Sequence, residues 1–194
     1  MITELYLIRH GIAGEADSQV NDAERQLTAK GHQKTKVVAL RLYEIGVRFD
    51  LILTSPLVRS RQTADILYSV GLSSRIEESP YLAPGGDFSA WLSWLEKWRD
   101  TPTESLGELT SQRLRYPHDL KLSKKGNESQ RALIQLALVG HQPDLGNWAE
   151  ILLWGDAKQK IILKKAGVIG LTIPATTTPV AQSQLFLLTS PKRL

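Results

Sequence analysis

Short apolar runs alternate along the chain with longer segments of helical periodicity, and this alternation constrains the fold most. The runs have the length and composition of buried strands and cover residues 3–8, 50–54, 132–139, 167–173 and 184–189. Helices are predicted between them, at residues 28–46, 55–71, 87–99 and 143–154. Because strands alternate with helices, the sequence predicts an α/β sandwich with a largely parallel central sheet.

Residues that cap helices mark where the expected helices begin. Thr28 is predicted to be the N-cap of the first helix. The apolar face of that helix is predicted to consist of Val37, Val38, Leu40, Leu42 and Ile45. Ser55, followed by Pro56, predicts the start of the second helix, and Asp87 is expected to cap the third. Three tryptophans at helical spacing follow Asp87 and are predicted to pack in the core.

Length and composition limit the classes of protein to consider. The 194 residues suit a single domain spanning 1–194, with a surface insertion or flap predicted at residues 101–127. The chain contains no cysteine, which excludes disulfides and cysteine nucleophiles and makes the cytoplasm the expected compartment. No apolar stretch approaches the roughly 20 residues that cross a bilayer, so no membrane partner is expected.

The charge of the chain favours anionic substrates over nucleic acid. The net charge is +4, and the Lys and Arg residues are spread along the sequence instead of forming one basic run with interleaved aromatic residues. A mild positive field of this kind attracts small anions as well as polyanions. Nucleic acid is therefore not an expected partner.

Polar clusters follow three of the predicted strands at their carboxyl ends. Arg-His-Gly occupies residues 9–11, Ser-Pro-Leu-Val-Arg occupies 55–59, and Gly-His occupies 140–141. Ligands of open α/β sheets bind beyond the carboxyl ends of the strands. We therefore expect the three clusters to converge on one edge of the sheet.

His10 meets the requirements of a nucleophile in phosphoryl transfer. A neutral imidazole can attack through one nitrogen when a backbone carbonyl keeps the other protonated, and Gly11 lets the backbone approach the ring. Arg9 and Arg59 offer guanidinium donors for phosphoryl oxygens, and His141 adds another donor if the charge of a nearby dianion favours its protonated form. Each residue alone also fits an ordinary role, such as a surface arginine or a loop histidine with satisfied hydrogen bonds.

Taken together, the clusters resemble the histidine phosphatase superfamily, in which an Arg-His-Gly motif follows the first strand. Further matches lie in the same order along the chain: Leu27-Thr28 with Gly31, Thr54-Ser55-Pro56-Leu57 with Arg59, Gln62-Thr63-Ala64, and Gly140-His141. Within the superfamily the chain looks most like SixA-type phosphohistidine phosphatases, through segments 82–87, 139–143 and 188–192. The resemblance implies a phosphoglycerate-mutase-like three-layer α/β/α sandwich that needs no metal or other cofactor.

The resemblance also implies roles for individual residues. His10 would be the phosphorylated nucleophile. The phosphoryl group of the substrate would be bound by Arg9, Gly11, Arg59 and His141. Water would then hydrolyse the phosphorylated His10 and release phosphate.

A general acid is harder to assign. Many relatives carry a glutamate after the middle strand, where this chain has Tyr81. Glu15 and Glu78 are the candidate acids, with Asp17 and Glu77 beside them. An alkoxide leaving group needs a proton more than a phosphorylated imidazole does. The lack of a clear acid therefore favours phosphohistidine as the substrate.

Three hypotheses follow from these observations. The first is a phosphatase that acts on a phosphohistidine of a signalling protein. The second is a phosphatase of small-molecule phosphomonoesters that uses the same pocket, for which a usable acid near His10 would be the distinguishing feature. The third is a non-catalytic anion-binding module, which the presence of His10 among the pocket residues disfavours.

Overall fold

The structure is a computed structural model, and it describes residues 2–15, 21–100, 133–175 and 178–193. The strands are β1 (Thr3–Arg9), β2 (Leu51–Thr54), β3 (Ile76–Glu78), β4 (Ile134–Gly140), β5 (Val168–Ile173) and β6 (Gln184–Thr189). The helices are α1 (Ala29–Glu44), α2 (Val58–Ser69), α3 (Phe88–Asp100) and α5 (Asp144–Trp154), with short 3₁₀ turns η1 (Asp22–Glu24) and η2 (Pro80–Leu82). The flap predicted at residues 101–127 lies outside the described residues.

The six strands form one sheet in the order β3-β2-β4-β1-β5-β6. The first four of these run parallel to one another, whereas β5 runs antiparallel to both of its neighbours. In the centre of the sheet, Leu136 of β4 is paired with Leu5 of β1 on one side and Leu51 of β2 on the other. The predicted largely parallel sheet is confirmed.

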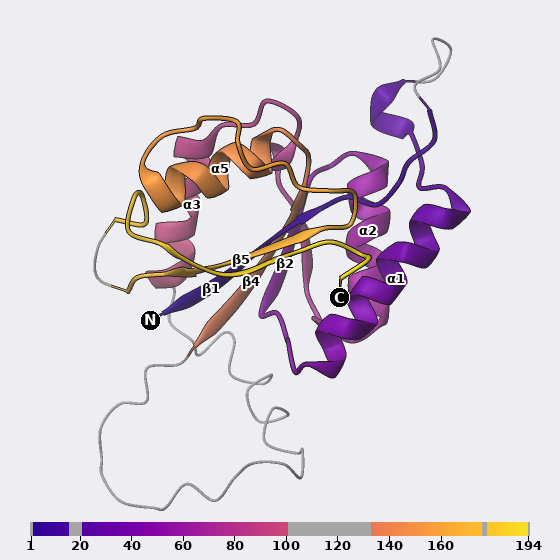
Figure 1. Ribbon diagram of the computed structural model, residues 1–194, viewed down its shortest axis with the longest axis horizontal. Coiled ribbons are helices and arrows are strands. Elements are labelled where there is room, and N and C mark those ends of the chain that lie inside the picture. Colours follow the sequence, from indigo (N-terminus) through magenta and orange to yellow (C-terminus); the bar gives the residue numbers. More distant parts are fainter. Residues whose placement is uncertain (1, 16–20, 101–132, 176–177, 194) are drawn as a thin grey trace, which may run out of the picture.

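Helices cover both faces of the sheet, as Figure 1 shows, with α3 and α5 on one side and α1 and α2 on the other. The first core centres on Trp91 and Trp148, whose stacked rings lie 5.0 Å apart. The second core contains Val38, Leu42 and Leu67. A sheet that is buried on both faces needs continuous apolar strands, which explains the apolar runs in the sequence. The three-layer α/β/α sandwich is therefore confirmed.

The cap predicted for α1 is confirmed, and its predicted apolar face is confirmed for two of its five residues and wrong for the other three. Thr28 Oγ1 accepts a hydrogen bond from Gly31 N at 3.0 Å. Val38 and Leu42 are buried on the face that packs against the sheet. Solvent exposes 40% or more of the side chains of Val37, Leu40 and Ile45. The helix packs with one narrow face, and these three residues lie off the line of buried positions that runs at intervals of three or four residues.

The start of α3 agrees with the prediction. Asp87 Oδ1 accepts a hydrogen bond from Ala90 N at 3.0 Å, which caps the helix. Trp91 is fully buried, and Trp94 and Trp98 pack partly buried against the same core. The tryptophans of this helix are core residues, as predicted.

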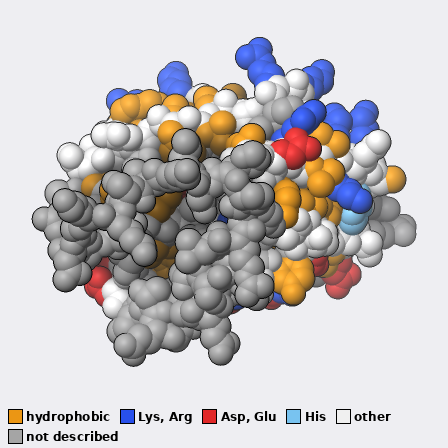
Figure 2. All heavy atoms as spheres, turned by 90° about the horizontal axis from the view of Figure 1, so that it is seen from below, with side chains coloured by type: hydrophobic (Ala, Val, Ile, Leu, Met, Phe, Trp, Pro, Cys, Tyr) orange, Lys and Arg blue, Asp and Glu red, His pale blue; other side chains and the backbone are white. Residues whose placement is uncertain are grey.

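The described surface gives two further observations. None of the helices in the described residues is long and apolar enough to span a membrane. On the described part of the face seen in Figure 2, Lys and Arg side chains lie mainly along the upper edge and at the upper right, among hydrophobic and other side chains.

Candidate active site

The segments that follow three adjacent parallel strands meet at one edge of the sheet. His10 N, after β1, donates to Gly140 O of β4 at 3.0 Å, and Ser55 N, after β2, donates to Val139 O at 3.0 Å. A cavity of about 480 Å³ lies at this edge. Among the side chains that line it are Arg9, His10, Arg59 and His141. The predicted convergence of the polar clusters is confirmed.

His10 is held in one tautomer by contacts on both ring nitrogens. The ring is 3% exposed; Nδ1 lies 2.8 Å from Gly11 O, and Nε2 lies 3.1 Å from the ammonium of Lys165. A carbonyl only accepts and an ammonium only donates, so Nδ1 carries the proton and Nε2 carries the lone pair. Burial, followed by the charges of Lys165, His141 and Arg59, lowers the pKa of His10 to about 2. The imidazole is therefore uncharged at neutral pH.

Gly11 allows the chain after β1 to approach two helices closely. A Cβ at this position would lie 2.5 Å from Thr35 Oγ1 of α1. Gly11 N donates to Thr63 Oγ1 of α2 at 3.0 Å, and that hydroxyl donates to Arg59 O at 2.8 Å. Gly11 is not among the described residues that line the cavity, although the sequence predicted that it binds substrate. Its visible contribution is the close packing that fixes His10.

Arg59 is the second residue of α2, and its guanidinium is 6% exposed at the cavity wall. Its Nη1 donates to the backbone oxygen of Asp22 at 2.6 Å and its Nη2 to Asp22 Oδ2 at 2.9 Å. The same carboxylate accepts from Arg25 Nη1 at 2.6 Å. Because a guanidinium has five N–H donors, the contacts with Asp22 leave others free for an anion.

Arg9 reaches the cavity from the end of β1. Its Nη1 donates to Leu163 O at 2.7 Å. Its Nε is buried and has no hydrogen-bond partner among the described residues. Burial lowers the pKa of Arg9 from its ordinary value, but an arginine stays charged at neutral pH. The site therefore contains a cationic donor that is not fully satisfied.

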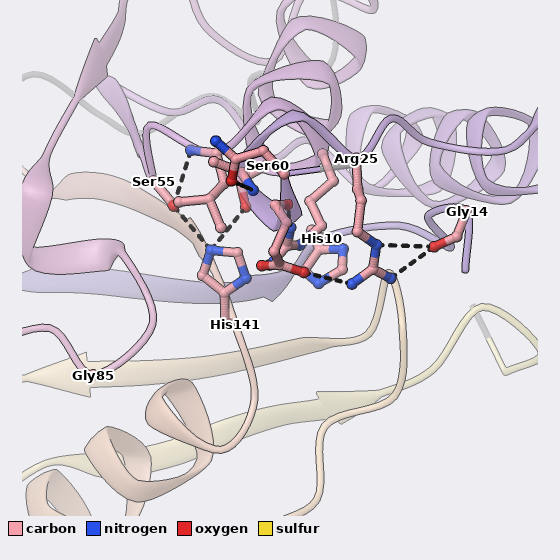
Figure 3. A network of polar contacts seen from close by, with 12 residues as sticks. His10, Gly14, Arg25, Ser55, Ser60, Gly85 and His141 are labelled. Carbon is pink, nitrogen blue, oxygen red and sulfur yellow. Dashed lines mark hydrogen bonds and ion pairs between the residues drawn. The ribbon is translucent and has the colours of Figure 1, made fainter. Parts of the chain in front are cut away.

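His141 faces His10 across the cavity, with the ring centroids 5.1 Å apart (Figure 3). Its Nε2 lies 2.8 Å from Ser55 Oγ and 3.4 Å from Ser60 Oγ. Burial, followed by the charges of Arg59 and Lys165, lowers the pKa of His141 to about 4. In the free protein at neutral pH the ring is therefore uncharged, and it becomes the expected cationic donor only if a bound dianion raises this pKa.

The prediction that Ser55 begins the second helix is wrong. The helix α2 starts at Val58, and its N-cap residue is Leu57. The Ser55 hydroxyl accepts from Leu57 N at 3.3 Å and contacts His141. The side chain thus supports the turn between β2 and α2 and also orients a histidine of the cavity.

The candidate acids named from the sequence do not line the cavity. Glu15 is exposed, and Glu78 is exposed on β3, where its carboxylate pairs with Arg61 at 2.9 Å. Glu77 pairs with Arg75 instead. Asp17 lies outside the described residues. Within the described chain, Glu15 and Glu78 are therefore not placed to donate a proton at His10.

Two carboxylates that the sequence analysis did not single out line the cavity. Asp22 is engaged by Arg59 and Arg25. Asp144, the first residue of α5, accepts from Gly85 N at 3.0 Å through Oδ2. In the described residues, no group of three or more acidic or histidine side chains is arranged to hold a metal ion.

Lys165 is the main cavity residue that sequence reasoning missed. Lys165 lies before the amino end of β5. Ligand-binding residues of open α/β sheets are expected after the carboxyl ends of parallel strands, so this expectation gives no reason to select Lys165. Because β5 is antiparallel to β1, its amino end lies at the edge of the sheet where β1 ends. Knowledge of the direction of β5 would have identified this position.

Comparison with known proteins identifies the family. The sequence profile of the histidine phosphatase superfamily (branch 1) matches residues 5–83. The chain is also 42% identical to an uncharacterized protein of Picosynechococcus sp. over 98% of each chain. This chain belongs to the histidine phosphatase superfamily. The superfamily assignment predicted from the Arg-His-Gly cluster is confirmed, and with it a phosphatase that uses a histidine nucleophile.

Solved structures of histidine phosphatases share the fold. The protein histidine phosphatase SixA, complexed with tungstate, has a TM-score of 0.70 and 19% identity, with 97% of each chain covered. The α-ribazole phosphatase of Shigella flexneri has a TM-score of 0.58 and 20% identity, with 97% of this chain and 96% of that chain covered. At these identities the likeness establishes the phosphoglycerate-mutase-like sandwich.

Proposed function

We propose that this protein hydrolyses phosphohistidine on a partner protein through a phospho-His10 intermediate. The observation that carries the proposal is the state of His10 in its cavity. An uncharged imidazole presents its Nε2 lone pair beside Arg9, Arg59 and Lys165, which can bind the phosphoryl group. Phosphoryl transfer depends mainly on alignment and on positive donors for the oxygens, and this arrangement offers both.

The proposed reaction has two steps. In the first, His10 Nε2 forms a bond to phosphorus while the bond from phosphorus to the partner's imidazole breaks, and that imidazole takes up a proton from solvent. Arg9 and Arg59 bind the phosphoryl oxygens, and His141 becomes a third donor when the bound dianion raises its pKa and the ring takes up a proton from solvent. In the second step, water attacks phosphorus and loses a proton to solvent, the bond to His10 breaks with its electron pair returning to Nε2, and inorganic phosphate is released.

The substrate class is inferred from the carboxylates of the site. Asp22 is held by two arginines, Asp144 accepts a hydrogen bond from Gly85 N, and Glu15 and Glu78 lie away from the cavity. An imidazole leaves phosphorus with less help from an acid than an alkoxide does. This arrangement favours phosphohistidine, and the fold likeness to SixA agrees with it.

The setting of the reaction is part of the same proposal. The guanidinium and ammonium groups of the cavity can neutralise the transferred phosphoryl group, so we propose a metal-independent reaction. A chain without cysteine fits a reducing compartment, so we propose that the partner is a cytoplasmic signalling protein.

Asp144 favours a second candidate function, the hydrolysis of small phosphomonoesters. Its carboxylate lines the cavity, and the solved α-ribazole phosphatase shares the fold. If Asp144 were protonated at the moment of transfer, it could donate to an alkoxide.

A comparison of substrates tests the proposal. Rates are measured, with a chelator and without added metal, on a phosphohistidine-bearing protein domain and on a panel of phosphomonoesters. We expect faster turnover of the phosphohistidine domain, with no loss of rate in the chelator. Faster turnover of the esters would favour the second function. If neither the phosphohistidine domain nor the esters were hydrolysed, the result would favour a non-catalytic anion-binding module.

A further inference from the structure

The loop between α5 and β5 places the ammonium group of Lys165 beside the nucleophile His10. Lys165 lies two residues before Gly167, and its Nζ lies 3.1 Å from His10 Nε2, the nitrogen that carries the lone pair. The residue is half-buried and lines the cavity. The ammonium therefore lies within hydrogen-bond distance of the atom proposed to attack phosphorus.

Several contacts fix the path of this loop. Fully buried Glu150 of α5 accepts hydrogen bonds from the backbone N–H groups of Lys158, Lys160 and Ile161. Gln142, beside His141, donates to Ile161 O at 2.8 Å. The loop is thus attached to a core helix and to the segment that follows β4. Such ordering reduces the conformational freedom lost when the lysine binds a ligand.

The residue after Lys165 fixes the loop to the nucleophile itself. Ala166 N donates to Arg9 O at 3.1 Å and to His10 O at 3.2 Å. Ala166 adopts φ +55°, a left-handed conformation that is strained for a non-glycine residue. The strained turn is compatible with a loop whose geometry is fixed at the site.

No described carboxylate lies within ion-pair distance of the Lys165 ammonium. Burial, followed by the charges of Arg9, Arg59 and Arg25, lowers the pKa of Lys165 to about 8, and Asp22 opposes this shift. The charged and titratable groups that act on it or contact it are Arg9, Arg25, Arg59, Asp22, His10 and His141. A half-buried cation in a cluster of other cations is a site for an anion.

We propose that Lys165 is a catalytic residue that binds a nonbridging oxygen of the transferred phosphoryl group. This inference rests on the proposed function, because it assigns a role in the same reaction. In the free protein the ammonium donates to His10 Nε2. When that lone pair forms the bond to phosphorus, the ammonium loses its acceptor, and a phosphoryl oxygen at the attack distance of about 3 Å lies within its reach.

The position of Lys165 distinguishes it from a leaving-group acid. In an in-line displacement the leaving group lies on the side of phosphorus opposite to the nucleophile. Lys165 contacts the nucleophile, so its charge acts on the equatorial oxygens in both steps, and no proton leaves its ammonium. The role requires a positive charge at this position and does not require that the group give up its proton during the reaction.

Three variants test this role. Lys165→Met removes the charge and keeps much of the side-chain length, and Lys165→Arg keeps the charge. Lys164→Met is the matched control, because Lys164 is exposed and does not line the cavity. For each protein, kcat/KM is measured against pH with p-nitrophenyl phosphate and a phosphohistidine-bearing domain, and orthovanadate affinity is measured by calorimetry.

We expect Lys165→Met to lower kcat/KM on the order of 10²-fold and to weaken vanadate binding, as loss of one transition-state donor does. Lys165→Arg should keep most of the activity and move the basic limb of the wild-type pH profile, expected near 8, to higher pH. Lys164→Met should match wild type. Wild-type kcat/KM and vanadate affinity in Lys165→Met, or an unmoved basic limb in Lys165→Arg, would overturn the role.

The same experiment separates this inference from the proposed function. If wild type hydrolyses its substrate and Lys165→Met does so equally well, the role of Lys165 is wrong and the proposed function stands. If wild type hydrolyses neither substrate, the proposed function is wrong, and the vanadate affinities of the three variants still decide whether Lys165 binds an anion of this geometry.

Discussion

At the scale of single residues, the site is governed by the cost of burying charge. The pKa values of His10 and His141 lie at about 2 and about 4, well below the ordinary value near 6.5. Burial is the largest cause in both cases, and neighbouring cations add to it. Both rings are consequently neutral in the free protein. A bound dianion would offset the cations, so the charge of His141 depends on the ligand, whereas the Nε2 lone pair of His10 is available without one.

Arg59 is expected to bind the anion directly. We predict that Arg59→Ala weakens orthovanadate binding about 10- to 100-fold, from the 1.5–3 kcal/mol that a hydrogen bond to a charged group contributes. Arg61→Ala is the matched control, because Arg61 lies on the same helix but is exposed and paired with Asp65 and Glu78. Calorimetric titration measures both affinities. Equal affinities in the two variants would remove Arg59 from the binding site.

At the scale of elements, the loop between α5 and β5 depends on one buried carboxylate. Burial raises the pKa of Glu150. Hydrogen bonds from the backbone N–H groups of Ile161, Lys158 and Lys160 lower it by more than burial raises it, so the pKa lies below its ordinary value. The unfolded state therefore binds a proton more readily than the folded state. This contribution to stability is fully present above the unfolded pKa of about 4.3 and is lost as the pH falls through the folded pKa.

We predict that Glu150→Gln lowers the free energy of unfolding by about 2 kcal/mol at pH 7, because an amide accepts these hydrogen bonds less well than a carboxylate. Urea unfolding followed from pH 7 to pH 3 measures the difference from wild type. The difference should narrow as the pH falls. A constant difference, or none at pH 7, would show that the charge of Glu150 does not stabilise the loop.

Element by element, the sequence predicted what local patterns determine. The helix that follows Thr28 and the strand that became β4 were expected because a cap and an apolar run are local signals. The short strand β3 was not predicted, since three half-exposed or exposed residues carry no apolar pattern. Ser55 was misassigned because its hydroxyl contacts His141, which lies far away in the sequence.

The same distinction applies to the site. The carboxyl ends of parallel strands are recognisable from sequence, so the placement of His10, Arg59 and His141 could be predicted. The placement of Lys165 and Asp22 could not, because Lys165 lies in the loop before β5 and Asp22 in the short turn η1, and the positions of both segments depend on tertiary contacts. The candidate acids Glu15 and Glu78 were chosen by closeness in sequence, but both side chains are exposed to solvent, and Glu78 forms an ion pair with Arg61.

At the scale of the whole molecule, the order of the strands creates the site. Three parallel strands lie side by side in the order β2, β4 and β1, so the segments that follow them meet at one edge of the sheet. Because β5 runs in the opposite direction, its amino end lies at the same edge. Helices bury both faces of the sheet, so this edge is where polar groups can gather without disturbing the two cores. The fold thereby places a neutral imidazole within a cluster of cations.

The central claim is that His10 carries the phosphoryl group during turnover. The most direct test is to mix the protein with a phosphohistidine-bearing domain, quench the reaction in alkali, which preserves phosphohistidine, and locate the phosphoryl group by peptide mass spectrometry. We predict one phosphoryl group on the peptide that contains His10, and neither label nor turnover in a folded His10→Ala variant. A phosphoryl group on another residue, or full turnover in His10→Ala, would contradict the account.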